Sequence, residues 1–149
     1  MGQAREVMDR LTEALTGKPD LEVIGELFAE DAVAVTPDGG ELHGRDSIVE
    51  YWRQMTDAVP EGSFESLHAY EIGNTAIDEG FFGGRNSGPI HMPDGESLPA
   101  TQKDVRIRGV DLATVGEDGR IVDYRLYFDE LDFLGQLGLL PEEESGEPS

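Results

Sequence analysis

The sequence predicts an α+β domain in which helices come first and most of the long strands follow. Three segments place apolar residues three or four positions apart, the spacing of one helix face: 3–16, 20–28 and 47–59. Four later segments are expected to be strands: 63–72, 75–84, 101–115 and 121–129. At 149 residues the chain can bury one core. We therefore expect one domain over residues 1–140 and an acidic disordered tail over 141–149.

The net charge of −21 is the most extreme feature of the composition. It argues against nucleic acid and anionic membranes as partners, because both would repel the chain. Either a halophile-type acidic surface or GC-rich codon usage together with the acidic tail would produce this charge. The absence of cysteine excludes a disulfide, a thiolate nucleophile and a Cys-based metal site. No run reaches the roughly 18 apolar residues of a membrane span, and the N-terminus lacks a signal-peptide core, so we expect a cytoplasmic protein.

The first half of the chain is expected to fold as two short helices, a strand pair and a third helix. Asp20 is a suitable N-cap for the second helix, whose apolar stripe extends to Phe28. A strand at 32–36 is joined to a short strand at 41–43 by a Pro-Asp-Gly-Gly turn. The third helix carries two aromatic residues on its apolar face: Tyr51 and Trp52.

The middle of the chain predicts a strand pair with one irregularity. The strands at 63–72 and 75–84 are joined by a turn at Gly73-Asn74. Phe64, Leu67 and Tyr70 do not share one parity, so we predict a bulge in the first of the two strands. The stretch that follows, 85–99, is expected to be a long loop.

The C-terminal stretch predicts a β-hairpin and a closing helix. An Asp-Gly turn at 116–119 joins the last two strands, and an apolar stripe from Leu131 to Leu140 predicts the helix. The last strand has two faces: Val122, Tyr124, Leu126 and Phe128 on one, and Asp123, Arg125, Tyr127 and Asp129 on the other. The first face is the more apolar. If it lines the core, Arg125 and Tyr127 point outward; otherwise they face a pocket.

Two stretches resemble one known family. The run GVDLATVGEDGRIVDYRLYFDELDFLGQLGL at 109–139 and the run DAVAVTPDGGELHGRDSIVEYW at 31–52 resemble the SnoaL-like polyketide cyclase branch of the nuclear transport factor 2-like superfamily. The resemblance implies a cone-shaped fold, in which a curved antiparallel sheet wraps about three helices around a deep apolar pocket. It also implies cofactor-free acid–base chemistry on a hydrophobic, oxygenated small molecule, and a homodimer. The long loop at 85–99 would then be a rim or lid over the pocket mouth.

Three residues are candidates for catalysis. The resemblance assigns the acid/base role to Asp129, since a carboxylate at the lip of an apolar pocket loses hydration and its pKa rises. The alternative is that Asp129 only caps the closing helix. Asp111 lies mid-strand, where a carboxylate is costly to bury unpaired, so it either faces the pocket or pairs with Arg125 on the next strand. His68 is the third candidate, with an ordinary surface or core position as its alternative.

The expected substrate-binding residues are aromatic or lie on the last strand: Phe28, Tyr51, Trp52, Arg125 and Tyr127. The aromatic helix residues line a pocket or are plain core. The three histidines are too far apart in sequence for a compact metal motif, so no metal is expected. The family resemblance implies that no cofactor is needed either. The alternatives to an acid–base enzyme are a module that binds an apolar ligand without transforming it and a dimerisation module whose pocket is filled by its own side chains.

Overall fold

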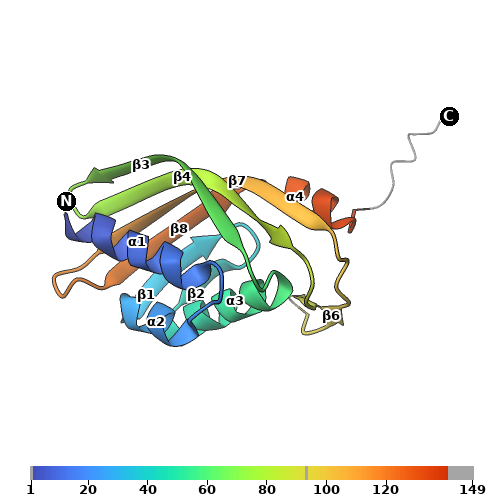
Figure 1. Ribbon diagram of the computed structural model, residues 1–149. Helices are drawn as coiled ribbons and strands as arrows, with labels where there is room; N and C mark the ends of the chain where they lie inside the picture. The colour runs from blue at the N-terminus through green and yellow to red at the C-terminus, as the bar shows by residue number, and fades with distance from the viewer. Residues whose placement is uncertain (1, 93, 141–149) are drawn as a thin grey trace.

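A curved six-stranded sheet forms the body of the computed structural model, which describes residues 2–92 and 94–140 (Figure 1). The predicted tail at 141–149 lies outside the described residues. The strands of this sheet are β1 (Phe28–Thr36), β2 (Gly40–His43), β3 (Ser63–Ile72), β4 (Thr75–Arg85), β7 (Asp104–Val115) and β8 (Ile121–Phe128). The helices are α1 (Gln3–Leu15), α2 (Leu21–Leu27), α3 (Arg45–Ala58) and α4 (Glu130–Leu137).

The strand order β2-β1-β8-β7-β4-β3 gives a mostly antiparallel sheet. The exception is the contact between β1 and β8, which run parallel. Figure 1 shows α1, α2 and α3 on the inner side of the curved sheet, while α4 lies at the far end beside β7. The predicted α+β cone is confirmed, with one parallel strand pair in place of a wholly antiparallel sheet.

The local signals in the sequence produce the expected turns. Gly73 and Gly119 adopt φ angles of +58° and +82° in the β3–β4 and β7–β8 turns, where a side chain would be strained. The bulge predicted in β3 is confirmed, because the register with β4 shifts between Ser66 and His68. Asp20 caps α2 as predicted, and its side chain accepts a hydrogen bond from Val23 N.

Phe28 differs from its predicted place in the second helix. The helix ends at Leu27, and Phe28 takes an extended backbone conformation and begins β1. Its side chain is fully buried, and its ring packs edge-on against Tyr124 with the ring centroids 6.0 Å apart. Phe28 is therefore a core residue of the sheet.

The predicted long loop after β4 contains a small hairpin. Two strands, β5 (Ile90–His91) and β6 (Ser97–Leu98), pair antiparallel beside the end of α3 (Figure 1). The buried side chain of Asn86 anchors this segment: its Nδ2 donates to Ala58 O at 2.8 Å, and its Oδ1 accepts from Thr101 N at 2.7 Å. Short strands held by such contacts leave little periodicity in the sequence.

The apolar face of β8 faces the helices. Tyr124 and Leu126 are buried, whereas Arg125 and Tyr127 are exposed on the outer face. Val122 has the same parity as Tyr124 and Leu126 but is exposed, because the register between β7 and β8 shifts at the start of β8. The alternative that the sequence left open is thus resolved: Arg125 and Tyr127 point outward.

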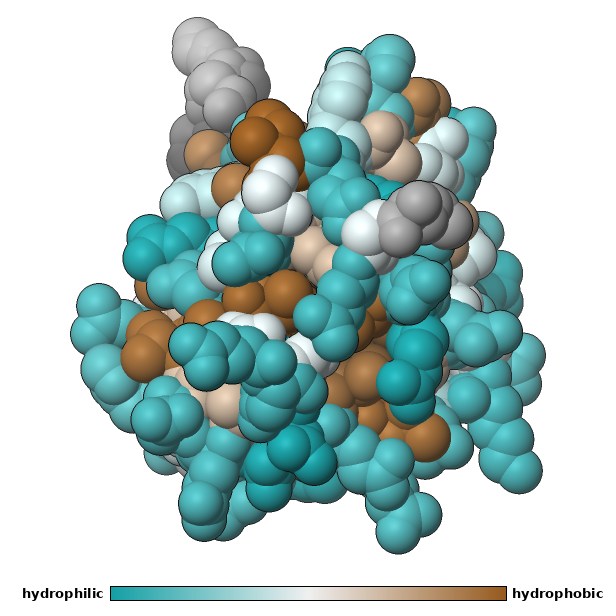
Figure 2. All heavy atoms as spheres, turned by 90° about the vertical axis from the view of Figure 1, so that its left-hand side faces the viewer, coloured by the Kyte–Doolittle hydropathy of each residue, from teal (hydrophilic) through white to brown (hydrophobic). Residues whose placement is uncertain are grey.

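Much of the surface is hydrophilic, as the charged composition predicts. On the face of the molecule shown in Figure 2, hydrophilic side chains cover most of the area and apolar ones form smaller islands between them. Within residues 2–92 and 94–140, no helix has the length and apolar character needed to cross a membrane.

Candidate functional site

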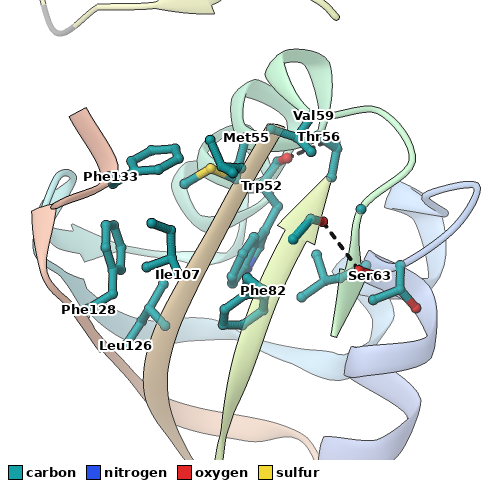
Figure 3. A pocket seen from close by; sticks show the side chains of 15 residues that line it. Trp52, Met55, Thr56, Val59, Ser63, Phe82, Ile107, Leu126, Phe128 and Phe133 are labelled. Atoms are coloured by element: carbon teal, nitrogen blue, oxygen red, sulfur yellow. Dashed lines mark hydrogen bonds between the residues drawn. The ribbon is translucent and has the colours of Figure 1, made fainter. Parts of the chain in front are cut away.

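An apolar cavity of about 100 Å³ lies between the helices and the sheet, and we call it the inner cavity (Figure 3). Most of its walls come from α3, from three strands of the sheet and from α4: Trp52, Met55, Thr56, Val59, Phe82, Val105, Ile107, Leu126, Phe128 and Phe133. On α3 the lining residues recur every three or four positions, so one face of this helix forms one wall.

The polar groups of the inner cavity are few. Among the described residues that line it there is no carboxylate, lysine, arginine or histidine. The hydroxyls of Thr16 and Thr56 donate to backbone carbonyls of their own helices at 2.9 Å. The indole N–H of Trp52 is buried and has no acceptor among the described residues. The lining therefore offers mainly apolar contact, and the ionisable side chains of the described residues lie outside it.

Asp111 is an ionisable group in a layer below the cavity. Its side chain faces inward from β7 and is 6% exposed, and its carboxylate accepts a hydrogen bond from the fully buried Tyr124 hydroxyl at 2.6 Å. Burial raises the pKa of Asp111 to about 7, while the hydrogen bond from Tyr124 acts in the opposite direction. Asp111 can therefore take up and release a proton near neutral pH. It does not pair with Arg125, whose guanidinium pairs with Asp123 on the outer face at 2.9 Å.

A second buried carboxylate, which the sequence analysis did not single out, lies beside Asp111. Asp78 on β4 is the register partner of Asp111 and is 4% exposed. It forms a two-point ion pair with Arg5 of α1: Nη1 lies 2.8 Å from Oδ1, and Nη2 donates to Oδ2 at 2.9 Å. The sequence signal for this ion pair was Arg5, which lies three residues before Met8 on the apolar face of the first helix.

The layer of Asp78 and Asp111 lies directly below the inner cavity. Phe82 and Ile107 of the cavity wall pair with each other across β4 and β7. The next pair on the same inner face of the two strands is Gly80 with Gly109, and the pair after that is Asp78 with Asp111. Aromatic side chains cover these glycines: a Cβ on Gly80 would meet the ring of Phe64, and one on Gly109 would lie 3.7 Å from the ring of Phe82. Beside them, Trp52 packs edge-on against Tyr124 with the ring centroids 5.7 Å apart.

Asp129 occupies the N-cap position of α4. Its side chain is exposed and accepts a hydrogen bond from Asp132 N at 3.0 Å, and it does not line the inner cavity. This geometry supports the capping alternative. The proposed acid–base role of Asp129 remains a prediction.

Replacing Asp129 by alanine should lower the free energy of unfolding by about 1 kcal/mol, because the cap hydrogen bond to α4 is lost. Urea unfolding measures this effect. Serine accepts the same hydrogen bond, so Asp129→Ser should recover most of the loss. Equal losses in both variants would contradict the capping role.

The other predicted site residues are dispersed. Tyr51 lines a second cavity on the opposite side of α3, and Trp52 lines the inner cavity. Arg125 and Tyr127 lie on the outer sheet face, away from both cavities. His68 lies on the edge strand β3, with its side chain 58% exposed and 4.0 Å from Glu79. Of these residues, only the two aromatic residues of α3 are brought to a cavity.

Metal binding has no support in the described part of the chain. Residues 2–92 and 94–140 contain no group of three or more histidine and acidic side chains arranged to hold an ion.

A curved sheet wrapped around helices with an apolar cavity beneath α3 defines the nuclear transport factor 2-like, or ketosteroid isomerase-like, class of fold. The chain belongs to the SnoaL-like domain family, whose model matches residues 8–124. A comparison with curated proteins gave no match.

Solved structures support the same fold. A putative SnoaL-like polyketide cyclase from Jannaschia sp. CCS1 is 17% identical, with 93% of this chain and 94% of that chain covered and a TM-score of 0.80. A protein with a ketosteroid isomerase-like fold from Catenulispora acidiphila is 21% identical, with 91% and 94% covered and a TM-score of 0.71. IdmH, a putative polyketide cyclase from Streptomyces antibioticus, is 24% identical, with 92% and 99% covered and a TM-score of 0.72. At these identities the likeness shows the fold alone.

Proposed function

We propose that the chain binds a hydrophobic, oxygenated small molecule in the inner cavity. The observation that carries this proposal is the lining of the cavity, where aliphatic and aromatic side chains from α3, the sheet and α4 surround a space that no charged group enters among the described residues. Each Å² of apolar ligand surface that is buried there would contribute roughly 25 cal/mol to the binding free energy. An oxygen that reaches the indole N–H of Trp52 would also satisfy a buried donor, which is costly to leave unpaired.

Replacing Thr56 by phenylalanine should abolish this binding, because the larger side chain fills the cavity from the α3 wall. The measurement is a calorimetric titration with 2-naphthol, an uncharged oxygenated bicyclic. We expect one site per chain and a loss of affinity of at least about tenfold, or 1.4 kcal/mol, in Thr56→Phe. The matched control is Arg53→Phe on the exposed side of the same helix. Unchanged binding in Thr56→Phe would refute the inner cavity as the site.

A second candidate is an acid–base enzyme of the SnoaL-like cyclase type, acting by cyclisation, isomerisation or hydration. It is favoured by Asp111, a carboxyl with a pKa of about 7 that is hydrogen-bonded to Tyr124 and lies one layer below the cavity. Such a group is matched to proton transfer at neutral pH. Tyr124 contacts both Asp111 and the cavity wall, since its hydroxyl donates to Asp111 and its ring packs against Trp52 of that wall.

Exchange of the acidic α-protons of 2-tetralone in D₂O, followed by NMR, tests this second candidate. We expect the wild-type chain to accelerate exchange by about 10²–10⁴-fold, the usual contribution of a positioned acid or base, and Asp111→Asn to remove the acceleration. Asp129→Asn should leave it intact. If Asp129→Asn abolished exchange and Asp111→Asn did not, the catalytic role would pass to Asp129. If neither the wild type nor a variant accelerated exchange, the ligand-binding function alone would stand.

The remaining expectations concern partners. We propose a homodimer that pairs through the outer face of the sheet, where Tyr70, Ile72 and Tyr127 are all at least half exposed. The charge of −21 makes nucleic acids and anionic membranes unfavourable partners and is compatible with a cytoplasmic protein. Light scattering at low and high salt tests the dimer, and a monomer at both would contradict it.

A further inference from the structure

A second cavity, which we call the outer cavity, adjoins the inner one. Its volume is about 440 Å³, and it lies between α3, α4, the β1–β2 turn and β5. Whereas α3 turns Trp52 and Thr56 toward the inner cavity, it turns Tyr51 and Gln54 toward the outer one. The helix is therefore a partition with a cavity on each side.

Three side chains belong to both cavities. Met55 of α3, Val59 just after its end and Phe133 of α4 line the inner and the outer cavity alike, and Figure 3 shows them together at one edge of the inner cavity. All three are only half-buried. Methionine is unbranched and adapts its shape easily. Side-chain rotation at this boundary would join the two cavities without moving the backbone.

The chemistry of the outer cavity differs from that of the inner one. Its lining includes the carboxylates of Asp38, Glu50 and Glu130, and no lysine or arginine among the described residues. Hydrogen bonding to Arg53 is the main cause that lowers the pKa of Glu50 to about 2, so Glu50 is ionised at neutral pH. The oxygens of Glu50 already accept from Arg53 and Gln54, so the carboxylates of Asp38 and Glu130 are the main acceptors that the outer cavity presents, beside the polar side chains of Ser47, Gln54, Asn86 and His91.

Tyr51 adds to this acceptor character. Its hydroxyl donates to Asp38 Oδ1 at 2.9 Å. Burial, and then the charge of Asp38, raises the pKa of Tyr51 well above its ordinary value. The phenol therefore keeps its proton and directs it to Asp38, and its oxygen, which also interacts with the Thr36 side chain, retains acceptor capacity for a donor on the ligand.

We infer that one elongated ligand occupies both cavities, with its apolar part in the inner cavity and a hydroxyl or amine donor in the outer cavity. This inference rests on the proposed function, since it assigns the second half of the same ligand. The shared wall of Met55, Val59 and Phe133 sets where the apolar part ends and the polar part begins.

Three naphthyl ethers test the inference, with 2-naphthol as the reference ligand that fills only the inner cavity. Each carries a four-carbon chain, which ends in an amine, a hydroxyl or a carboxylate. Titrations are run in about 1 M NaCl, where the Debye length is about 3 Å and the general negative charge of the surface is screened. We expect the amine and hydroxyl ethers to bind at least about tenfold more tightly than the carboxylate ether.

Two charge-matched variants separate the outer cavity from the overall charge. Glu130→Gln removes a carboxylate of the outer cavity, and Glu117→Gln removes one from the β7–β8 turn, outside both cavities. We expect Glu130→Gln to weaken the amine ether at least threefold while leaving 2-naphthol unchanged, and Glu117→Gln to change neither. Tight binding of 2-naphthol with no preference among the three ethers, or equal effects of the two variants, would overturn the two-cavity inference alone. Failure of 2-naphthol itself to bind would overturn both proposals.

Discussion

Replacing Arg5 by alanine is expected to lower the free energy of unfolding by about 3–5 kcal/mol, because it leaves the buried carboxylate of Asp78 without its cation. Both side chains are nearly inaccessible, at 11% and 5% exposed. Urea unfolding measures the loss. Arg53→Ala provides the contrast, since it removes an exposed ion pair with Glu50 and should cost no more than about 1 kcal/mol.

The double variant Arg5→Ala, Asp78→Asn distinguishes the ion pair from simple packing. If the loss in Arg5→Ala arises from an unpaired charge, neutralising Asp78 as well should recover a large part of it. A double variant as unstable as the single one would show that Arg5 contributes by packing. A loss in Arg5→Ala no greater than in Arg53→Ala would mean that water reaches Asp78.

The stability of the folded chain is expected to fall between about pH 4 and pH 7 because of Asp111. Its folded-state pKa of about 7 lies above the value of 3.8 for the free side chain, so the folded state holds a proton that the unfolded state has released. The contribution is fully present below pH 3.8 and is lost as the pH rises through 7. A shift of this size corresponds to an effect on the order of 4 kcal/mol.

Asp111→Asn isolates this contribution from the other carboxylates. Asparagine has the shape of the protonated acid and does not titrate, so the variant should lack this part of the pH dependence. Thermal unfolding of both proteins from pH 4 to pH 8 measures it. We expect the wild type to lose stability relative to the variant as the pH rises, and parallel curves would contradict the raised pKa.

Much of the fold could be predicted because its signals are local. Residues close together in the sequence produce each of three features: the Asp-Gly turn at Gly119, the cap at Asp20 and the bulge in β3. The family resemblance placed these elements in a cone. The β5–β6 hairpin escaped prediction because its position depends on Asn86, which bonds to Ala58 at the end of α3 and to Thr101 in the segment before β7.

The site was harder to predict than the fold. The apolar stripe of the third helix placed Trp52 on a buried face, and it lines the inner cavity. For Asp111 the sequence left open whether it faces the pocket or pairs with Arg125, and the structure shows it buried on the inner face. Parity alone could not show that Asp78 and Arg5 meet, because α1 and β4 are brought together only by tertiary packing. The outer cavity requires α4, β5 and the β1–β2 turn to converge, which no periodicity in the sequence encodes.

The parallel contact between β1 and β8 has a consequence for how the chain reaches its folded state. β1 pairs with β2 on one side, and β7, β4 and β3 form a continuous antiparallel set on the other, so β8 is the strand that joins the two halves. It is also the last strand to leave the ribosome. A nascent chain can therefore form both halves early, but it exposes the open edges of β1 and β7 until β8 has been synthesised, the interval in which such edges promote aggregation.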